Sequence, residues 1–111
     1  MTKAKRLRAI LDRMWSGLIL RRDVICKKCT LQPATSPHHI IPRRYTILRW
    51  DLDNGIGLCF KCHRIAHDNP AKFDRWLLTN VKVYGELIDK RRTYTFTLPE
   101  LEEIKEKLKK S

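Results

Sequence analysis

The sequence has no long apolar run, no repeat and no linker-like segment, and each absence excludes a class of protein. No stretch approaches the about 18 consecutive apolar residues that a membrane-spanning helix needs. Residues 1–23 carry basic residues on both sides of their apolar positions and lack the continuous apolar core of a signal peptide, so we expect an intracellular, cytoplasmic protein. With 111 residues and no internal boundary, we expect a single domain over residues 1–111.

Acidic residues are scarce in the N-terminal two thirds of the chain. The full sequence has 24 Lys and Arg against 12 Asp and Glu, a formal net charge of +12. Residues 1–67 contain 14 basic and 4 acidic residues, whereas residues 68–111 contain 10 and 8. A positive field of this kind attracts polyanions, with nucleic acid as the first candidate and an acidic membrane surface as the second. A solubility charge or a ribosome-like protein would explain the same balance.

Apolar periodicity predicts an α+β fold for the N-terminal two thirds. Leu7, Leu11 and Trp15 recur at four-residue intervals, which predicts an amphipathic helix over about 4–16. Short strands are expected at 38–41 and at about 55–58, and the second strand leads into a helix.

Helical signals dominate the C-terminal extension, which we place at about 70–110. Asn69-Pro70 is typical of an N-cap followed by proline at the first helical position. A further turn or two of helix is expected after it, and the alternation in RRTYTFT predicts a strand. Thr97 and Glu100 have the spacing of a capping box, which opens a last helix.

All four cysteines occur in two Cys-x-x-Cys pairs, Cys26–Cys29 and Cys59–Cys62. A two-residue gap lets a tight turn aim both sulfurs at one point, and two such turns complete a tetrahedron around Zn²⁺. Four thiolates leave no open coordination position, so the predicted zinc is structural rather than catalytic. Disulfides or a redox Cys-x-x-Cys are the alternatives, but the doubled motif without a signal peptide favours zinc.

All four histidines lie between residues 38 and 67, in the region that the predicted zinc site ties together. His63 and His67 are four residues apart and would share one face of a helix, where two imidazoles can bind one metal ion. Neighbouring side chains of a strand point to opposite faces, so His38 and His39 would meet different surroundings. Any one of the four could be a solvated or core histidine, yet His63 directly follows a predicted zinc ligand.

HHIIP, DNGIGL and CFKCHRIAH together resemble the HNH endonuclease family, over a motif core of residues 24–68. The resemblance implies a ββα-metal fold, in which two strands and a helix hold one catalytic metal ion. The three signature residues correspond to His39, Asn54 and His63. Their spacing, with His67 four residues further on, is similar to that of the nuclease colicins. The four-cysteine frame resembles zinc-stapled HNH proteins of phages and bacteria.

The resemblance implies a metal-dependent DNA endonuclease that leaves 5′-phosphate and 3′-hydroxyl ends. His39 would be the general base, and His38, His63 and His67 would hold the catalytic ion. The family favours Mn²⁺ or Mg²⁺, whereas imidazole donors suit Zn²⁺ or Ni²⁺ better than Mg²⁺. Asn54 is a turn residue in its DNG context; in the family it also orients the loop and the base, or in some relatives touches the metal.

DNA is the expected partner, and nicking with low sequence specificity by a monomer or weak dimer is the expected outcome. Other phage or mobile-element proteins are further partners suggested by the resemblance. The rival hypothesis is a non-catalytic zinc-binding DNA module, and a redox enzyme is a distant third. Arg43, Arg44 and Arg49 follow the predicted base and are expected to grip phosphates. Diffuse DNA affinity is expected from Lys3, Lys5, Arg6, Arg8, Arg13, Arg21 and Arg22.

Overall fold

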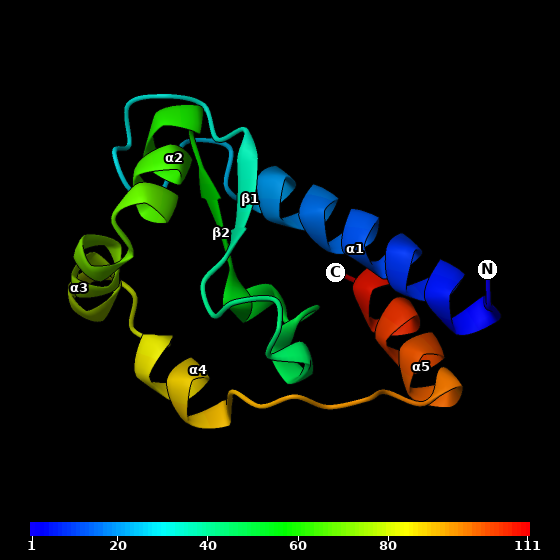
Figure 1. The fold of residues 1–111 in the computed structure, drawn as a ribbon. Helices are drawn as coiled ribbons and strands as arrows, with labels where there is room; N and C mark the ends of the chain where they lie inside the picture. The colour runs from blue at the N-terminus through cyan, green and yellow to red at the C-terminus, as the bar shows by residue number, and fades with distance from the viewer.

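The computed structural model describes residues 1–111 and has an α+β fold built around one β-hairpin. The hairpin lies in the centre of the molecule, with helices on both sides of it (Figure 1). In chain order the elements are α1 (Lys3–Arg22), β1 (Ser36–His39), the 3₁₀ turns η1 (Thr46–Leu48) and η2 (Leu52–Asn54), β2 (Gly55–Leu58), α2 (Phe60–Asp68), α3 (Pro70–Asn80), α4 (Tyr84–Lys90) and α5 (Leu98–Lys109).

The hairpin pairs β1 and β2 antiparallel, with His38 opposite Ile56 and His39 opposite Gly55. The second strand lies where the sequence predicts it, but the first covers Ser36–His39 rather than 38–41. It ends there because Asn54 takes over the pairing. The backbone of Asn54 accepts from the amide of Ile40, and its side chain accepts from the amide of Ile41.

Helix α1 is longer than the predicted segment 4–16, because its last turns pack on the hairpin. Ile19 is fully buried there. A Cβ atom at Gly55 would overlap the side chains of Ile19 and Trp15, so only glycine allows this close approach. Arg22 was expected to provide diffuse DNA affinity. It instead donates to the carboxylate of Asp23 and to the carbonyls of Leu52 and Gly55.

The segment 91–97 is extended but forms no strand, so the strand predicted from its alternation is wrong. The hydroxyl of Thr46 binds both the amide and the carbonyl of Tyr94, which occupies the groups that a strand partner would need. The predicted N-cap at Asn69 and the capping box of Thr97 and Glu100 are both present.

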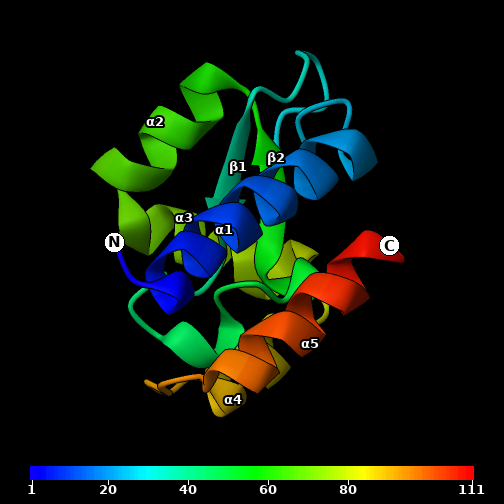
Figure 2. The same cartoon turned by 90° about the vertical axis from the view of Figure 1, so that its right-hand side faces the viewer.

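Two apolar clusters hold the molecule together, one on each side of the hairpin. The first joins the hairpin to α2, α3 and α4, and includes Leu58, Phe73 and Leu77. The second lies between α1 and α5, which run beside each other in Figure 2, and includes Trp15 and Trp50. The two histidines of β1 therefore face different clusters. His38 faces the first, and His39 faces the second.

Candidate metal centres and active site

The four cysteine sulfurs converge on one point beside the hairpin. All four lie within 4.8 Å of one another, and no disulfide joins them. The Sγ atoms of Cys29 and Cys59 are 3.9 Å apart, close to the about 3.8 Å that two thiolates bound tetrahedrally to one Zn²⁺ require. Cys59 is also the N-cap of α2, since its sulfur accepts from the amide of Cys62. This cluster fits a tetrahedral metal site and positions the start of α2.

The thiols of Cys62 and Cys26 have pKa values on opposite sides of the ordinary cysteine value. Burial and the neighbouring sulfurs raise the pKa of the Cys62 thiol to about 12. Burial also raises the pKa of Cys26, but backbone hydrogen bonds from Cys59, Cys29 and Lys28 outweigh it and bring that pKa to about 6. Four thiolates cannot share so small a space unless a cation compensates their charge, and a divalent ion supplies that compensation.

His38, His63 and His67 form a second cluster, on the face of the hairpin that α2 covers. One ring nitrogen from each lies within 4.8 Å of the others. The Nε2 atoms of His63 and His67 are 3.1 Å apart, near the about 3.4 Å between two imidazole nitrogens on one tetrahedral ion. The edge of the Phe73 ring closes the cluster from α3, with its centroid 5.4 Å from that of His38.

Burial favours the neutral form of two of these histidines, His38 and His63. It lowers the pKa of His38 to about 4, with a smaller contribution from the neighbouring histidines. Burial, followed by His67, also lowers the pKa of His63. Imidazole binds metal through the lone pair of its neutral form, so these pKa values favour metal binding near pH 7.

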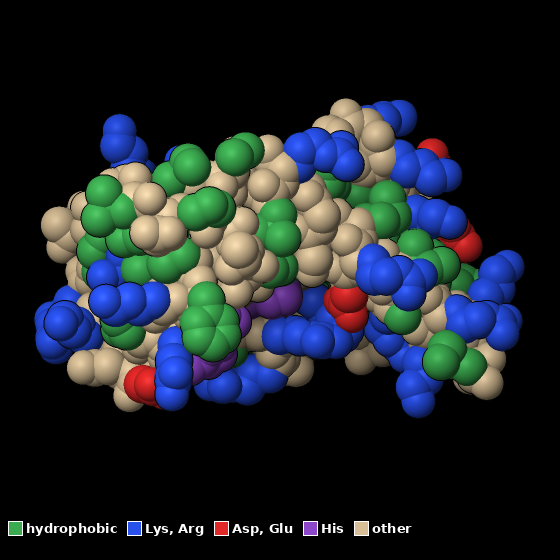
Figure 3. All heavy atoms as spheres, turned by 90° about the horizontal axis from the view of Figure 1, so that it is seen from above, with side chains coloured by type: hydrophobic (Ala, Val, Ile, Leu, Met, Phe, Trp, Pro, Cys, Tyr) green, Lys and Arg blue, Asp and Glu red, His purple; other side chains and the backbone are tan.

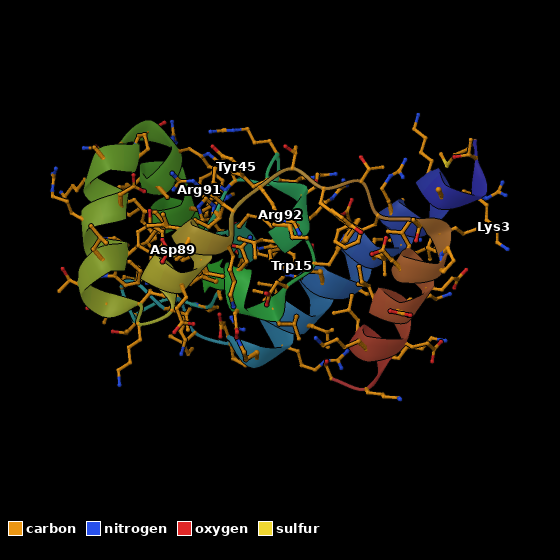
Figure 4. The ribbon with its side chains drawn as sticks, turned by 90° about the horizontal axis from the view of Figure 1, so that it is seen from below. Lys3, Trp15, Tyr45, Asp89, Arg91 and Arg92 are labelled. Carbon is orange, nitrogen blue, oxygen red and sulfur yellow. The ribbon has the colours of Figure 1, made fainter.

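His39 points to the opposite face of the hairpin, toward α1, as the alternation of a strand predicts. Its Nε2 lies 2.9 Å from the carbonyl oxygen of Arg49. A carbonyl only accepts, so Nε2 carries the proton and Nδ1 keeps its lone pair. Its ring stacks on Trp15, which Figure 4 shows beside the hairpin, with centroids 3.9 Å apart. Burial lowers the pKa of His39, and the Arg49 hydrogen bond partly offsets this.

Asn54 is fully buried beneath the loop that follows β1. Its Oδ1 accepts from the amide of Ile41 at 2.7 Å, and its Nδ2 donates to the carbonyls of Ile41 and Leu48 at 3.1 and 3.2 Å. Every polar atom of its side chain therefore has a partner within the chain. The side chain ties two parts of the loop together and is not among the residues that line the histidine cleft.

Asp12, on α1, binds the same loop from the other side. Its carboxylate accepts two hydrogen bonds from Arg49, one from Arg43 and one from the indole of Trp50. Burial raises the pKa of Asp12, but the bonds from Arg49 and Trp50 outweigh it and the net shift is downward. Sequence reasoning missed Asp12, although it is the only acidic residue of α1.

A cleft of about 810 Å³ opens beside both faces of β1. It is lined by all four histidines and by Arg43, Arg44 and Tyr45 from the loop. Figure 3 shows the histidine side chains in a hollow with Lys and Arg side chains around it. Arg49 does not line the cleft, and its side chain is 15% exposed with its guanidinium held by Asp12. In this structure Arg49 fixes the loop through Asp12, and its expected role as a DNA contact stays a prediction.

Residues 25–69 match the family model described as HNH endonuclease. This segment is an HNH endonuclease domain. It contains the hairpin, α2 and both metal-binding clusters, which are the parts of the ββα arrangement. Members of the family are metal-dependent phosphodiester hydrolases that act on nucleic acid, so this domain implies a metal-dependent nuclease activity. The comparisons with curated proteins and with solved structures gave no match.

Two parts of the chain lie outside the HNH segment and still contribute to its surroundings. Trp15 and Asp12 contact His39 and the loop from α1, and the C-terminal extension contributes residues to the cleft lining. No helix of the chain is both long enough and apolar enough to cross a membrane.

Proposed function

We propose that the chain is a DNA endonuclease that nicks one strand per encounter with low sequence specificity. The observation that carries this proposal is that the two neighbouring histidines of β1 lie on opposite faces of the strand and line one cleft. His38 joins two histidines of α2 on one face, and His39 keeps a free Nδ1 on the other, beside the same cleft. The net charge of +12 favours a polyanionic substrate. Cleavage would leave 5′-phosphate and 3′-hydroxyl ends.

His39 is the proposed general base. Its Nδ1 lone pair accepts the proton of the attacking water, while the Nε2–H keeps donating to the carbonyl of Arg49. The imidazolium that forms is placed against the face of Trp15, where the aromatic quadrupole attracts a cation. Because the ring is held on both sides, little reorganisation accompanies the proton transfer.

His38, His63 and His67 are the proposed ligands of the catalytic divalent ion, with Mn²⁺ or Mg²⁺ as working ions and Zn²⁺ or Ni²⁺ as alternatives. When bound, such an ion supplies Lewis-acid stabilisation of phosphate charge and of the leaving oxygen. Asn54 acts as a positioning residue, because it fixes the loop whose Arg49 carbonyl orients His39. Arg43 and Arg44 line the cleft and are proposed phosphate contacts.

The four-cysteine cluster is the proposed structural zinc site. Its sulfur spacing and its complete set of four thiols support this assignment. The zinc would fix the chain before β1 to the turn that starts α2, and so hold His38 opposite His63.

The test is conversion of supercoiled plasmid in the presence of EDTA or of a series of added divalent ions. We expect metal-dependent formation of the open circular form, with linear DNA appearing only later. Purified protein that nicks under none of the ions, yet still binds DNA, would favour a non-catalytic zinc-binding module instead.

A further inference from the structure

The cleft is partly lined by the C-terminal extension. Arg44 and Tyr45 line it from the loop after β1. Arg91, which directly follows α4, lines it from outside the HNH segment. The extension therefore contributes a cation to the same cleft as the histidines.

Arg44 and Arg91 share one aromatic ring and have no acidic partner. Their guanidinium carbons lie 4.9 and 5.9 Å from the centre of the Tyr45 ring. Neither guanidinium has a carboxylate within 4.0 Å, whereas Arg43 and Arg49 are both paired with Asp12. The only acidic residue in the cleft lining, Asp74, instead accepts a hydrogen bond from the hydroxyl of Tyr84.

The position of Arg91 is set by hydrogen bonds of the residues that follow it. The amide of Ile47 donates to the carbonyl of Arg92 at 3.2 Å, and Thr46 binds the backbone of Tyr94. The extension is thus attached to η1, next to Tyr45. Figure 4 shows Tyr45 and Arg91 side by side, where the chain leaves α4.

We infer that Arg44 and Arg91, placed together on Tyr45, form one phosphate-binding site that holds the DNA backbone next to the cleavage position. This inference rests on the proposed function for its substrate. Two unpaired cations in one cleft repel each other, and a phosphate placed between them removes that repulsion. The planar guanidinium fork matches phosphate oxygens. The ring face of Tyr45 is already covered by arginine, so the site binds a phosphate rather than a stacked base.

The test is the affinity for a short fluorescent DNA duplex, measured by fluorescence anisotropy without added divalent ions over a range of salt concentrations. Arg44→Gln and Arg91→Gln should each raise Kd about tenfold. Each should also reduce the slope of log K against log salt concentration by about 1.

Arg92→Gln is the matched control. Arg92 is exposed, has no carboxylate partner, and lies over the ring of Tyr94 rather than in the cleft lining. We expect its Kd and salt slope to equal those of the wild type. Equal losses in all three variants would mean a diffuse charge effect and would overturn the inference, as would wild-type values for Arg44→Gln and Arg91→Gln.

The binding assay is independent of cleavage, so the two proposals can fail separately. Protein that binds through Arg44 and Arg91 but nicks no plasmid would contradict the proposed function and leave the phosphate site standing. Protein that nicks plasmid while Arg44→Gln and Arg91→Gln bind as the wild type does would contradict the site alone.

Discussion

The imidazole of His39 lies flat against the indole of Trp15, with ring centroids 3.9 Å apart and an angle of 5° between the ring planes. Trp15 comes from α1, which lies outside the HNH segment, and its own Nε1 donates to the carbonyl of Asp51 at 2.9 Å. The proposed base is therefore held by two contacts of different origin. Arg49 fixes one edge of the ring, and Trp15 fixes one face.

Removal of the Trp15 ring should slow cleavage through the position of His39. We expect Trp15→Phe to retain most of the activity, because a ring still covers the imidazole. Trp15→Leu should lower kcat about tenfold, the cost of a modest misplacement of the base. Single-turnover cleavage of a labelled duplex measures the rate. Leu101→Ala is the control, because Leu101 is fully buried in the same apolar cluster but belongs to α5 and is not part of the ring stack with His39. A kcat that falls equally in Leu101→Ala, at a temperature where both proteins are folded, would rule out a specific role for Trp15.

Asp12→Asn should separate DNA affinity from the rate of cleavage. The substitution removes a negative charge beside the cleft and releases Arg43, so DNA should bind at least as tightly. It also weakens the hold on Arg49, whose carbonyl orients His39, so kcat should fall. Anisotropy gives the affinity and single-turnover cleavage gives kcat. A wild-type rate in this variant would show that the Asp12 network does not position the base.

Burial of Asn54 predicts a large loss of stability for Asn54→Ala. The substitution leaves the amide of Ile41 and the carbonyls of Ile41 and Leu48 without their side-chain partner, at a cost of about 3 kcal/mol. Asn80→Ala is the control, since exposed Asn80 makes one hydrogen bond within α3, and it should cost less than about 0.5 kcal/mol. Urea unfolding measures both. A small effect at Asn54 would contradict its proposed role in holding the loop.

The pH dependence of cleavage should have an acid limb below the ordinary histidine range. His39 accepts a proton only when neutral, so activity rises with pH as His39 loses its proton. Burial lowers the pKa of His39 from its usual 6.5, and burial brings the pKa of His38 to about 4. Both shifts move the acid limb to lower pH, so activity should be near its plateau at pH 7. A midpoint above 6.5 in a pH series at saturating metal would contradict the neutral, buried environment of these groups.

Cys59→Ser should remove both zinc and the folded hairpin. Cys59 contributes a sulfur to the cluster and caps α2, so its loss affects the metal site and the helix that carries His63. We expect zinc content, measured by atomic emission, to fall from one ion per chain to none, together with the loss of a cooperative thermal transition. A zinc-free variant that folds and cleaves DNA would refute the structural role of zinc.

Local spacing made much of this molecule predictable. The two Cys-x-x-Cys turns, the i, i+4 pair His63 and His67, and the capping box at Thr97 all depend on residues close in sequence. The strand expected at 91–97 failed for the opposite reason, since alternation is a local pattern whereas a strand also needs a free partner. There Thr46 occupies the backbone of Tyr94 instead.

The residues around His39 could not be predicted in the same way. Trp15 and Asp12 were recognisable only as a core aromatic and a lone acid in a basic helix. Their partners His39, Arg49 and Trp50 follow more than twenty residues later, and only the packing of α1 on Gly55 brings them together. The true length of α1 depends on the same packing, which is why a pattern confined to residues 4–16 ended too early.

His39 is the proposed base, and the proposed metal ligands are separate from it. The most direct measurement is single-turnover cleavage by His39→Ala with divalent metal binding followed by calorimetry on the same protein. We predict that cleavage falls at least a hundredfold, while the affinity for the metal ion and the thermal transition stay near those of the wild type. Cleavage by His39→Ala at the wild-type rate would contradict the account.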